Sequence, residues 1–271
     1  TIADLWKKYE SAQKADLPKK QLEILAEIKT EALKDGLVWD FYDAARHTVT
    51  VGRNLNWKKA DSLSAAFAAE IESLNSPVAG LHYRLQEGCT RGELLSYVKS
   101  NEKALRASHT PELYSRNILS LHLGIGLYLQ KCYTDDWNFA LWALWTRCSG
   151  SEKAAAAAML RGNLADSYPQ RALMEYLNLA ALPDGKPKEA EAATYLKTYE
   201  GRAVCALARG EILNMRWNFV NQPPVGTPPA TEDDYKALYG DVKALLSDIG
   251  KFGGEEKTIA ELTEARVKNI E

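Results

Sequence analysis

The stretch LWKKYESAQKADLPKKQLEILAEI, from Leu5 to Ile28, decides the fold class. Apolar residues recur at helical spacing on both sides of Asp16, which predicts one helix over residues 2–14 and a second that ends at Gly36. Asp16 is a residue type that caps helices, and Pro18 is tolerated in a first helical turn. Because the link is so short, the two helices should lie antiparallel with their apolar stripes facing each other.

The same pattern continues along the chain, with cap, acidic or proline residues at helix starts and glycine, asparagine or proline near helix ends. The predicted helices cover residues 38–51, 57–74, 78–86, 93–105, 112–132, 137–148, 152–166, 170–182, 189–219 (broken near Gly201), 232–249 and 254–270. Two successive helices take about 35–40 residues, the length of a tetratricopeptide-type (TPR-type) hairpin, although the TPR consensus is not met. We predict an all-α fold, an irregular α–α superhelix of stacked antiparallel helix hairpins that is TPR-like.

The longest irregular segment is rich in proline and suggests the domain organisation. Residues 221–230 read NQPPVGTPPA, and four prolines make this stretch stiff and extended. We predict a superhelical domain over residues 1–220, a Pro-rich linker loop over 221–231, and a C-terminal helix pair over 232–271 packed on the same superhelix. Thr231 and Asp234 have the spacing of a capping box at the start of that pair. The early end of the last helix suggests that the native chain continues.

The composition is that of a globular protein with 46% hydrophobic and 26% charged residues among 271. The net charge of -2 argues against an electrostatic grip on nucleic acid, which needs a basic face. No apolar run approaches the roughly 20 residues that span a bilayer, so we expect no membrane-spanning segment. The chain starts at Thr1 without an initiator methionine, which indicates either a removed leader or a cut chain.

The residues that usually carry catalysis or bind metals show no recognisable motif. The histidines (His47, His82, His109 and His122) match no metal-ligand spacing, and the cysteines (Cys89, Cys132, Cys148 and Cys205) include no C-x-x-C pair. Buried free thiols are the expected state of the cysteines, but spacing alone leaves their disulfide state open. Gly124 and Gly126 lack the third glycine of a dinucleotide fingerprint and suggest a close helix contact instead. We therefore predict no catalytic residue, no metal, no cofactor and no enzymatic activity.

Tryptophan is the residue type that most suggests a binding surface. Phe139 and three tryptophans fall within residues 137–145, and one helical stripe cannot hold them all. Either this helix is buried on most sides, which we favour, or an aromatic ring is exposed and can stack on a sugar or anchor a peptide. A second candidate surface lies beside the Pro-rich loop. The tentative partner or ligand surface comprises Trp137, Trp142, Arg216 and Trp217.

The opening residues also carry a family resemblance. Leu5–Glu10 and Asp16–Glu23 resemble the helical N-terminal region of large alpha-2-macroglobulin-like proteins of Bacteroidetes, in which a tryptophan helix precedes a D-L-P-K turn and a helix of the form L-E-x-x-x-x-I. The isoleucine of that pattern corresponds to Ile28. The resemblance implies a secreted, periplasmic or envelope-associated protein, with its leader removed, in which this region precedes macroglobulin domains.

Macroglobulin domains trap proteases, in some members through a Cys-x-Glu-Gln thioester, and no cysteine of this chain stands in that pattern. We therefore expect a non-catalytic helical scaffold that binds a protein partner or other domains of its own chain. A lipid can anchor the longer parent protein to a membrane. The alternative is a secreted glycan- or peptide-binding module that uses exposed aromatic residues.

Overall fold

The computed structural model describes residues 1–117, 133–147, 151, 155–156, 158–159, 168–268 and 270. These residues form α-helices joined by turns, with one short 3-10 helix and no strand among them. The expected all-α class is therefore confirmed. No helix in this described part is both long and apolar enough to cross a membrane.

The helices fall into two compact units. The first contains the described residues up to 117 and those from 133 to 159, and the second contains the described residues from 168 onward. This division differs from the expected one, because a boundary falls inside the predicted 1–220 domain. The predicted linker 221–231 lies within the second unit, where the helix after it packs back on the helix before it.

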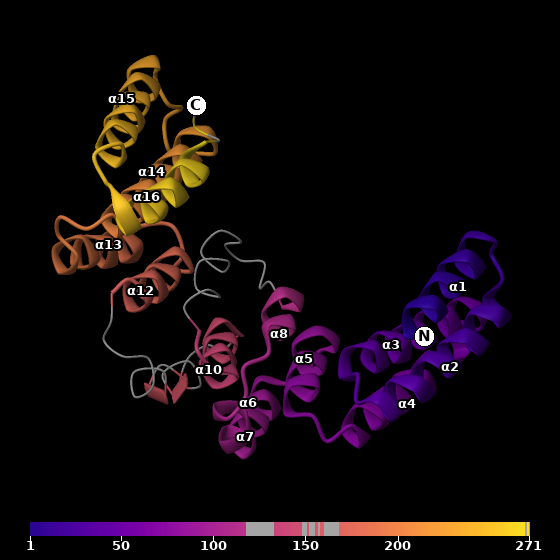
Figure 1. Cartoon of the computed structure of the whole chain (residues 1–271). Coiled ribbons are helices and arrows are strands. Elements are labelled where there is room, and N and C mark those ends of the chain that lie inside the picture. Colours follow the sequence, from indigo (N-terminus) through magenta and orange to yellow (C-terminus); the bar gives the residue numbers. More distant parts are fainter. Residues whose placement is uncertain are drawn as a thin grey trace. The chain divides into compact units, whose positions relative to one another are not determined.

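The first unit begins with helices that lie side by side in chain order: α1 (Ile2–Lys14), α2 (Pro18–Asp35), α3 (Val38–Leu55) and α4 (Ala60–Ser73), as Figure 1 shows. Between α1, α2 and α3, a small core buries the apolar faces that the sequence pattern marks; it consists of Tyr9, Ala12, Ile24, Leu25, Ile28, Ala44 and Val51. A second core continues from α3 to α4 and the next helix. The predicted opening hairpin is therefore present.

The turn between α1 and α2 departs from the prediction in one respect. Pro18 starts α2, and Gly36 ends it in the left-handed region with a φ of 69°, as expected. The prediction that Asp16 caps α2 is wrong, because Leu17 holds the cap position and offers no side-chain oxygen. Asp16 instead makes the turn itself with a φ of 51°. Short polar side chains tolerate this conformation better than other residues do.

Helix α3 is longer than predicted, because Gly52 does not end the helix but allows close packing against α4. The helix continues through Gly52 to Leu55. A Cβ atom at Gly52 would lie 2.8 Å from Leu63 Cδ1 of α4, so the missing side chain lets the two helices approach. Trp57, which we expected inside α4, lies in the 3-10 helix η1 (Trp57–Lys59) and is 75% exposed.

The rest of the first unit consists of shorter helices: α5 (Pro77–Glu87), α6 (Arg91–Ser100), α7 (Glu102–Arg106), α8 (Pro111–Arg116) and α10 (Asp136–Arg147). Residues 93–105, predicted as one helix, form two that meet at Asn101. Helix α10 packs on α5, α6 and α7. Residues 118–132 lie outside the described residues, and only a few residues of the helix predicted over 152–166 are described. The residues outside the described part include His122, Gly124, Gly126, Cys132 and Cys148.

The second unit is arranged around one helix. It contains α12 (Gln170–Ala180), α13 (Lys186–Thr198), α14 (Val204–Asn221), α15 (Glu232–Ile249) and α16 (Gly254–Val267), and α14 contacts the other four. The predicted break near Gly201 is confirmed, and so is the capping box of Thr231 with Asp234. Close packing between α14 and α16 depends on Gly210, where a Cβ atom would lie 3.3 Å from the Thr263 methyl group.

Candidate functional site

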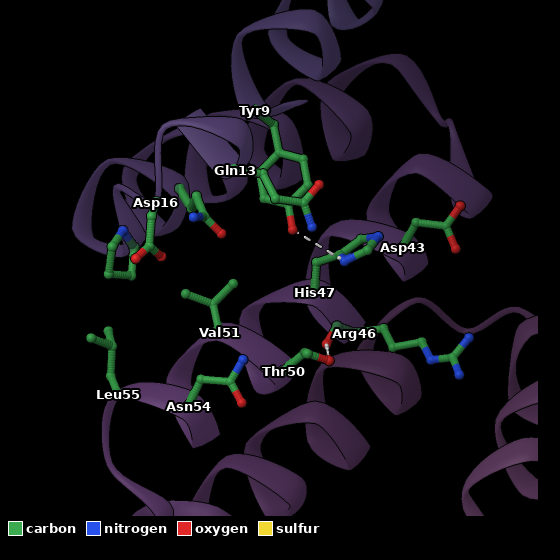
Figure 2. Close-up of a pocket in the computed structure, with 12 residues that line it drawn as sticks. Tyr9, Gln13, Asp16, Asp43, Arg46, His47, Thr50, Val51, Asn54 and Leu55 are labelled. Carbon is green, nitrogen blue, oxygen red and sulfur yellow. Dashed lines mark hydrogen bonds between the residues drawn. The ribbon is translucent and has the colours of Figure 1, made fainter. Parts of the chain in front are cut away.

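A groove of about 550 Å³ lies between α1 and α3, beside the turn that leads into α2 (Figure 2). Its size falls within the range of small-ligand pockets in proteins. Most of its lining side chains are polar; the lining consists of Tyr9, Gln13, Asp16, Pro18, Gln21, Asp43, Arg46, His47, Thr50, Val51, Asn54 and Leu55. The groove therefore lies between the first helices of two successive hairpins.

Two side-chain hydrogen bonds join α1 to α3. The Tyr9 hydroxyl lies 3.2 Å from His47 Nδ1, and the Trp6 indole N–H donates to Asp40 Oδ1 at 2.7 Å. The planes of the Tyr9 and His47 rings are tilted by 50° to each other, with centroids 5.2 Å apart. Figure 2 shows the Tyr9 hydroxyl pointing at the imidazole across the groove. These contacts fix the spacing of the two helices that form the groove walls.

Burial determines the protonation state of this pair. It lowers the pKa of the half-buried His47 below its usual value, so the imidazole is neutral near pH 7. Burial also raises the pKa of the Tyr9 hydroxyl, which keeps its proton. If Tyr9 donates this proton to Nδ1 of His47, Nε2 must carry the imidazole proton.

The charged residues at one end of the groove are already paired. Arg116 donates to both carboxylate oxygens of Asp43, at 2.6 and 2.7 Å, and this hydrogen bonding raises the pKa of the guanidinium. Its guanidinium also lies 4.7 Å from the centroid of the Trp39 ring. Arg46 contacts Glu87 at 3.6 Å and remains largely exposed. Pairing of this kind leaves little net charge at that end.

Three lining side chains have no such partners. The Gln13, Asn54 and Asp16 side chains are exposed and form no hydrogen bond with any residue that the structure describes. The two carboxamides come from opposite walls of the groove, α1 and α3. A carboxamide can donate and accept at once, so each matches one peptide unit of a bound chain. No sequence motif marks this pair, because it depends on the pairing of α1 with α3.

The tryptophans of the first unit belong to its core. Trp137 and Trp142 are only 1% and 3% exposed, and Phe139 and Trp145 are buried as well. The interpretation of α10 as a helix buried on most sides therefore fits the structure. The alternative, in which Trp137 and Trp142 form a ligand surface, does not. Three helices pack around α10, so the helix has no solvent face wide enough for a ring.

Arg216 and Trp217 lie at the surface of the second unit, but they do not share a face. Adjacent residues on a helix point in different directions. Arg216 pairs with Asp241 at 2.6 Å, whereas Trp217 contacts the Tyr235 ring edge-on at a centroid distance of 6.3 Å. Asp241 and Tyr235 lie on opposite flanks of α15, six residues apart. A ligand surface at Trp217 therefore stays a prediction, and Arg216 does not share its face.

Two buried carboxylates form networks that the sequence pattern does not reveal. Glu211 of α14, 4% exposed, accepts hydrogen bonds from Lys188, Arg266 and Tyr176, which come from three other helices. Asp136 accepts three hydrogen bonds of 2.8 Å from Thr110 and Tyr114. In both networks, the hydrogen bonds are to residues of the chain itself, which indicates a structural role.

The histidines and cysteines of the described chain have similar local roles. His82 is buried and its Nδ1 lies 2.6 Å from the Asn117 amide, while His109 lies 3.2 Å from the Tyr114 hydroxyl. Cys89 and Cys205 are free thiols. In the part of the chain that the structure describes, no group of three or more His, Cys, Asp or Glu side chains is placed to hold a metal ion.

Comparisons of the chain with family models, with curated proteins and with solved structures give no match. The resemblance of residues 5–28 to alpha-2-macroglobulin-like proteins therefore stays a prediction from those residues. At the level of class, the structure defines an all-α protein with a polar groove between successive helix hairpins.

Proposed function

We propose that this chain is a non-catalytic helical scaffold whose α1–α3 groove holds an extended segment of a protein partner or of another domain of its own chain. The observation that carries the proposal is the pair of exposed carboxamides, Gln13 and Asn54, on opposite walls of one groove. Each lacks a hydrogen-bond partner among the described residues and can pair with a main-chain N–H and C=O together.

The dimensions of the groove suit an extended peptide. On α3 its lining runs from Asp43 to Leu55, which corresponds to about 18 Å at the rise of an α-helix. An extended chain advances about 3.3 Å per residue, so roughly five residues fit along this length. Val51 and the exposed Leu55 lie near the end opposite Asp43 and can receive an apolar side chain.

The wider context of the proposal is a TPR-like superhelix in a secreted or envelope-associated protein. The packing of α1 to α4 on one another in chain order supports the superhelix. Stacked helix hairpins of this kind form concave surfaces that bind partners. The resemblance of the opening residues supports the location.

A peptide selection experiment tests the groove. A library of random seven-residue peptides is displayed and selected on the whole 271-residue chain, and the selected peptides are measured by fluorescence polarisation. The test variant is Gln13→Ala combined with Asn54→Ala. The matched control is Asn178→Ala, which removes an exposed helical carboxamide from α12.

We expect selected peptides to bind the double variant about tenfold more weakly, because two hydrogen-bonding side chains are lost. The Asn178→Ala control should bind like the wild type. Peptides that bind the double variant and the wild type equally well would place the peptide site elsewhere and contradict the proposal. A selection that yields no binding peptide would contradict it as well.

A further inference from the structure

Three aromatic rings from α14 and α15, which pack together in the second unit, form a row at its surface. Trp217 contacts Tyr235 with ring centroids 6.3 Å apart, and Tyr239 follows Tyr235 one helical turn later. Tyr235 and Tyr239 are 40% and 44% exposed, and Trp217 is half-buried. We call Trp217, Tyr235 and Tyr239 the ring row.

The ring row is not needed to close the core. The inward face of α15 consists of Leu238, Val242, Leu245 and Ile249, all of which are buried. The apolar pattern of residues 232–249 predicts Tyr235 on that inward face, but it lies beside the face and is 40% exposed. The tyrosines therefore leave apolar ring surface in water without contributing to the core, which suggests a binding role.

Polar side chains border the ring row on its solvent side. At helical spacing, Glu232, Lys236 and Lys243 lie on the same flank of α15 as Tyr239. Glu232 and Lys236 form an ion pair at 2.7 Å in which both side chains are more than two-thirds exposed. The Lys243 ammonium lies 4.5 Å from the centroid of the Tyr239 ring. The border therefore offers a carboxylate acceptor and two ammonium donors.

This combination of groups matches a carbohydrate. Aromatic faces pack against the C–H faces of a sugar ring, while sugar hydroxyls both donate and accept hydrogen bonds. The two tyrosines stand four residues apart, about 6 Å along the helix axis, which is comparable to the step between neighbouring sugars. A proline-rich peptide would also stack on aromatic rings, but it offers mainly carbonyl acceptors, whereas sugar hydroxyls can pair with both the Glu232 carboxylate and the lysine ammonium groups.

We propose that the ring row binds a linear oligosaccharide, independently of the groove in the first unit. Trp217, Tyr235 and Tyr239 stack against successive sugars, and Glu232, Lys236 and Lys243 bind their hydroxyl groups. Trp217 was one of the residues expected to form a ligand surface, and the ring row supplies the neighbours that such a surface needs.

Isothermal titration calorimetry on the whole chain tests this site. The probes are maltohexaose, cellohexaose, xylohexaose and chitohexaose, with a ten-proline peptide as the competing class. The test variant is Tyr239→Ala, since this exposed ring can be removed without opening the core. The control is Phe219→Ala, which removes a 37% exposed ring from α14 two residues beyond Trp217, on another side of that helix.

We expect at least one hexasaccharide to bind, and Tyr239→Ala to weaken it about tenfold. Phe219→Ala should leave the affinity unchanged within about twofold. Tyr239→Phe should keep most of the binding, because the ring face is retained. Circular dichroism should show the same helical content in all variants.

Three results would overturn the proposal. The first is that no hexasaccharide binds with a dissociation constant below about 1 mM. The second is that Tyr239→Ala binds the sugar as well as the wild type does, which would place the sugar elsewhere. The third is that the proline peptide alone binds and loses affinity in Tyr239→Ala, which would assign the ring row to proline-rich partners.

Discussion

Tyr9 and His47 stand 38 residues apart in the chain, and a contact of 3.2 Å between the tyrosine hydroxyl and imidazole Nδ1 joins the first helices of two successive hairpins. Burial favours the neutral form of both groups. The contact therefore joins α1 to α3 without introducing a charge into the groove between them.

The Tyr9–His47 contact should be measurable as a coupling between two substitutions. We expect Tyr9→Phe to lower the free energy of unfolding by about 1 kcal/mol, since it leaves Nδ1 of His47 without its hydrogen-bond partner. In a double-mutant cycle with His47→Leu, measured by urea denaturation, the coupling energy should be about 0.5–1.5 kcal/mol. A coupling energy near zero would mean that the hydrogen bond contributes nothing to the joining of α1 and α3.

Gly80→Ala should destabilise the first unit. A methyl group at Gly80 would overlap the Tyr97 hydroxyl, which donates to Pro77 O at 3.0 Å and lies under Arg84. Overpacking of this kind costs about 1–3 kcal/mol. The measurement is the free energy of unfolding in urea.

Gly92→Ala is the matched control for Gly80→Ala. Gly92 lies in α6, and nothing lies within 4 Å of the position that its Cβ atom would take. Since alanine favours helices over glycine, this change should be neutral or stabilise by up to about 1 kcal/mol. Equal effects of the two substitutions would contradict the tight α5–α6 contact.

Glu211→Ala should destabilise the second unit strongly. The substitution leaves Arg266 without its carboxylate partner and leaves Lys188, only 3% exposed, with Asp184 as its remaining one. Breaking a buried ion pair from one side costs about 3–5 kcal/mol. Thermal and urea unfolding of the whole chain provide the measurement.

Two further variants test whether the burial of Glu211 and Lys188 causes the loss of stability in Glu211→Ala. Glu23→Ala removes one partner of the exposed Lys20–Glu23 pair and should change the free energy of unfolding by less than about 1 kcal/mol. Replacing Glu211 and Lys188 together by Met should recover part of the lost stability, because the double variant contains fewer uncompensated buried charges than Glu211→Ala does. A Glu211→Ala variant as stable as Glu23→Ala would show that the network carries no stability.

The stability of the first unit should fall in mild acid because of His82. Burial lowers the pKa of this imidazole to about 4 from 6.5. Between these values the unfolded chain binds a proton that the folded chain does not, so the contribution is complete above pH 6.5 and is lost as the pH falls towards 4. The loss approaches about 1.4 kcal/mol per pH unit at most.

His82→Gln should flatten this pH dependence, because glutamine does not titrate. Its amide oxygen can still accept a hydrogen bond from Asn117. The free energy of unfolding is measured at pH 7, 6 and 5 for both proteins. His47 contributes in the same direction because its pKa is also lowered, so His47→Gln provides a comparison. Parallel curves for wild type and His82→Gln would show that His82 does not cause the acid sensitivity.

Local features of this fold could be predicted from sequence, whereas contacts between distant residues could not. The hairpin around Pro18 and the capping box at Thr231 depend on residues within a few positions of one another, and both are present. Gly52 was misread as a helix end because a glycine that ends a helix and one that admits Leu63 look alike in sequence. Asp16 was likewise misread, since its residue type suits both a cap and a left-handed turn.

The candidate sites likewise depend on contacts between distant residues, which could not be predicted from sequence. Trp217 could be singled out as an unusual aromatic residue, but its neighbours Tyr235 and Tyr239 become a surface only when α15 folds back on α14. Periodicity assigned Tyr235 to the core, although it stands at the edge of the apolar stripe. The groove depends on Gln13 and Asn54, two ordinary polar residues that the pairing of α1 and α3 brings to opposite walls.

Helix α14 touches all four of its neighbours in the second unit and carries the carboxylate on which three of them converge. It cannot unwind without releasing α12, α13, α15 and α16. Its backbone amides should therefore exchange with deuterium more slowly than those of any other helix in that unit, at the rate set by global opening. Proteases should likewise find no cleavable segment within Val204–Asn221 until the whole unit opens.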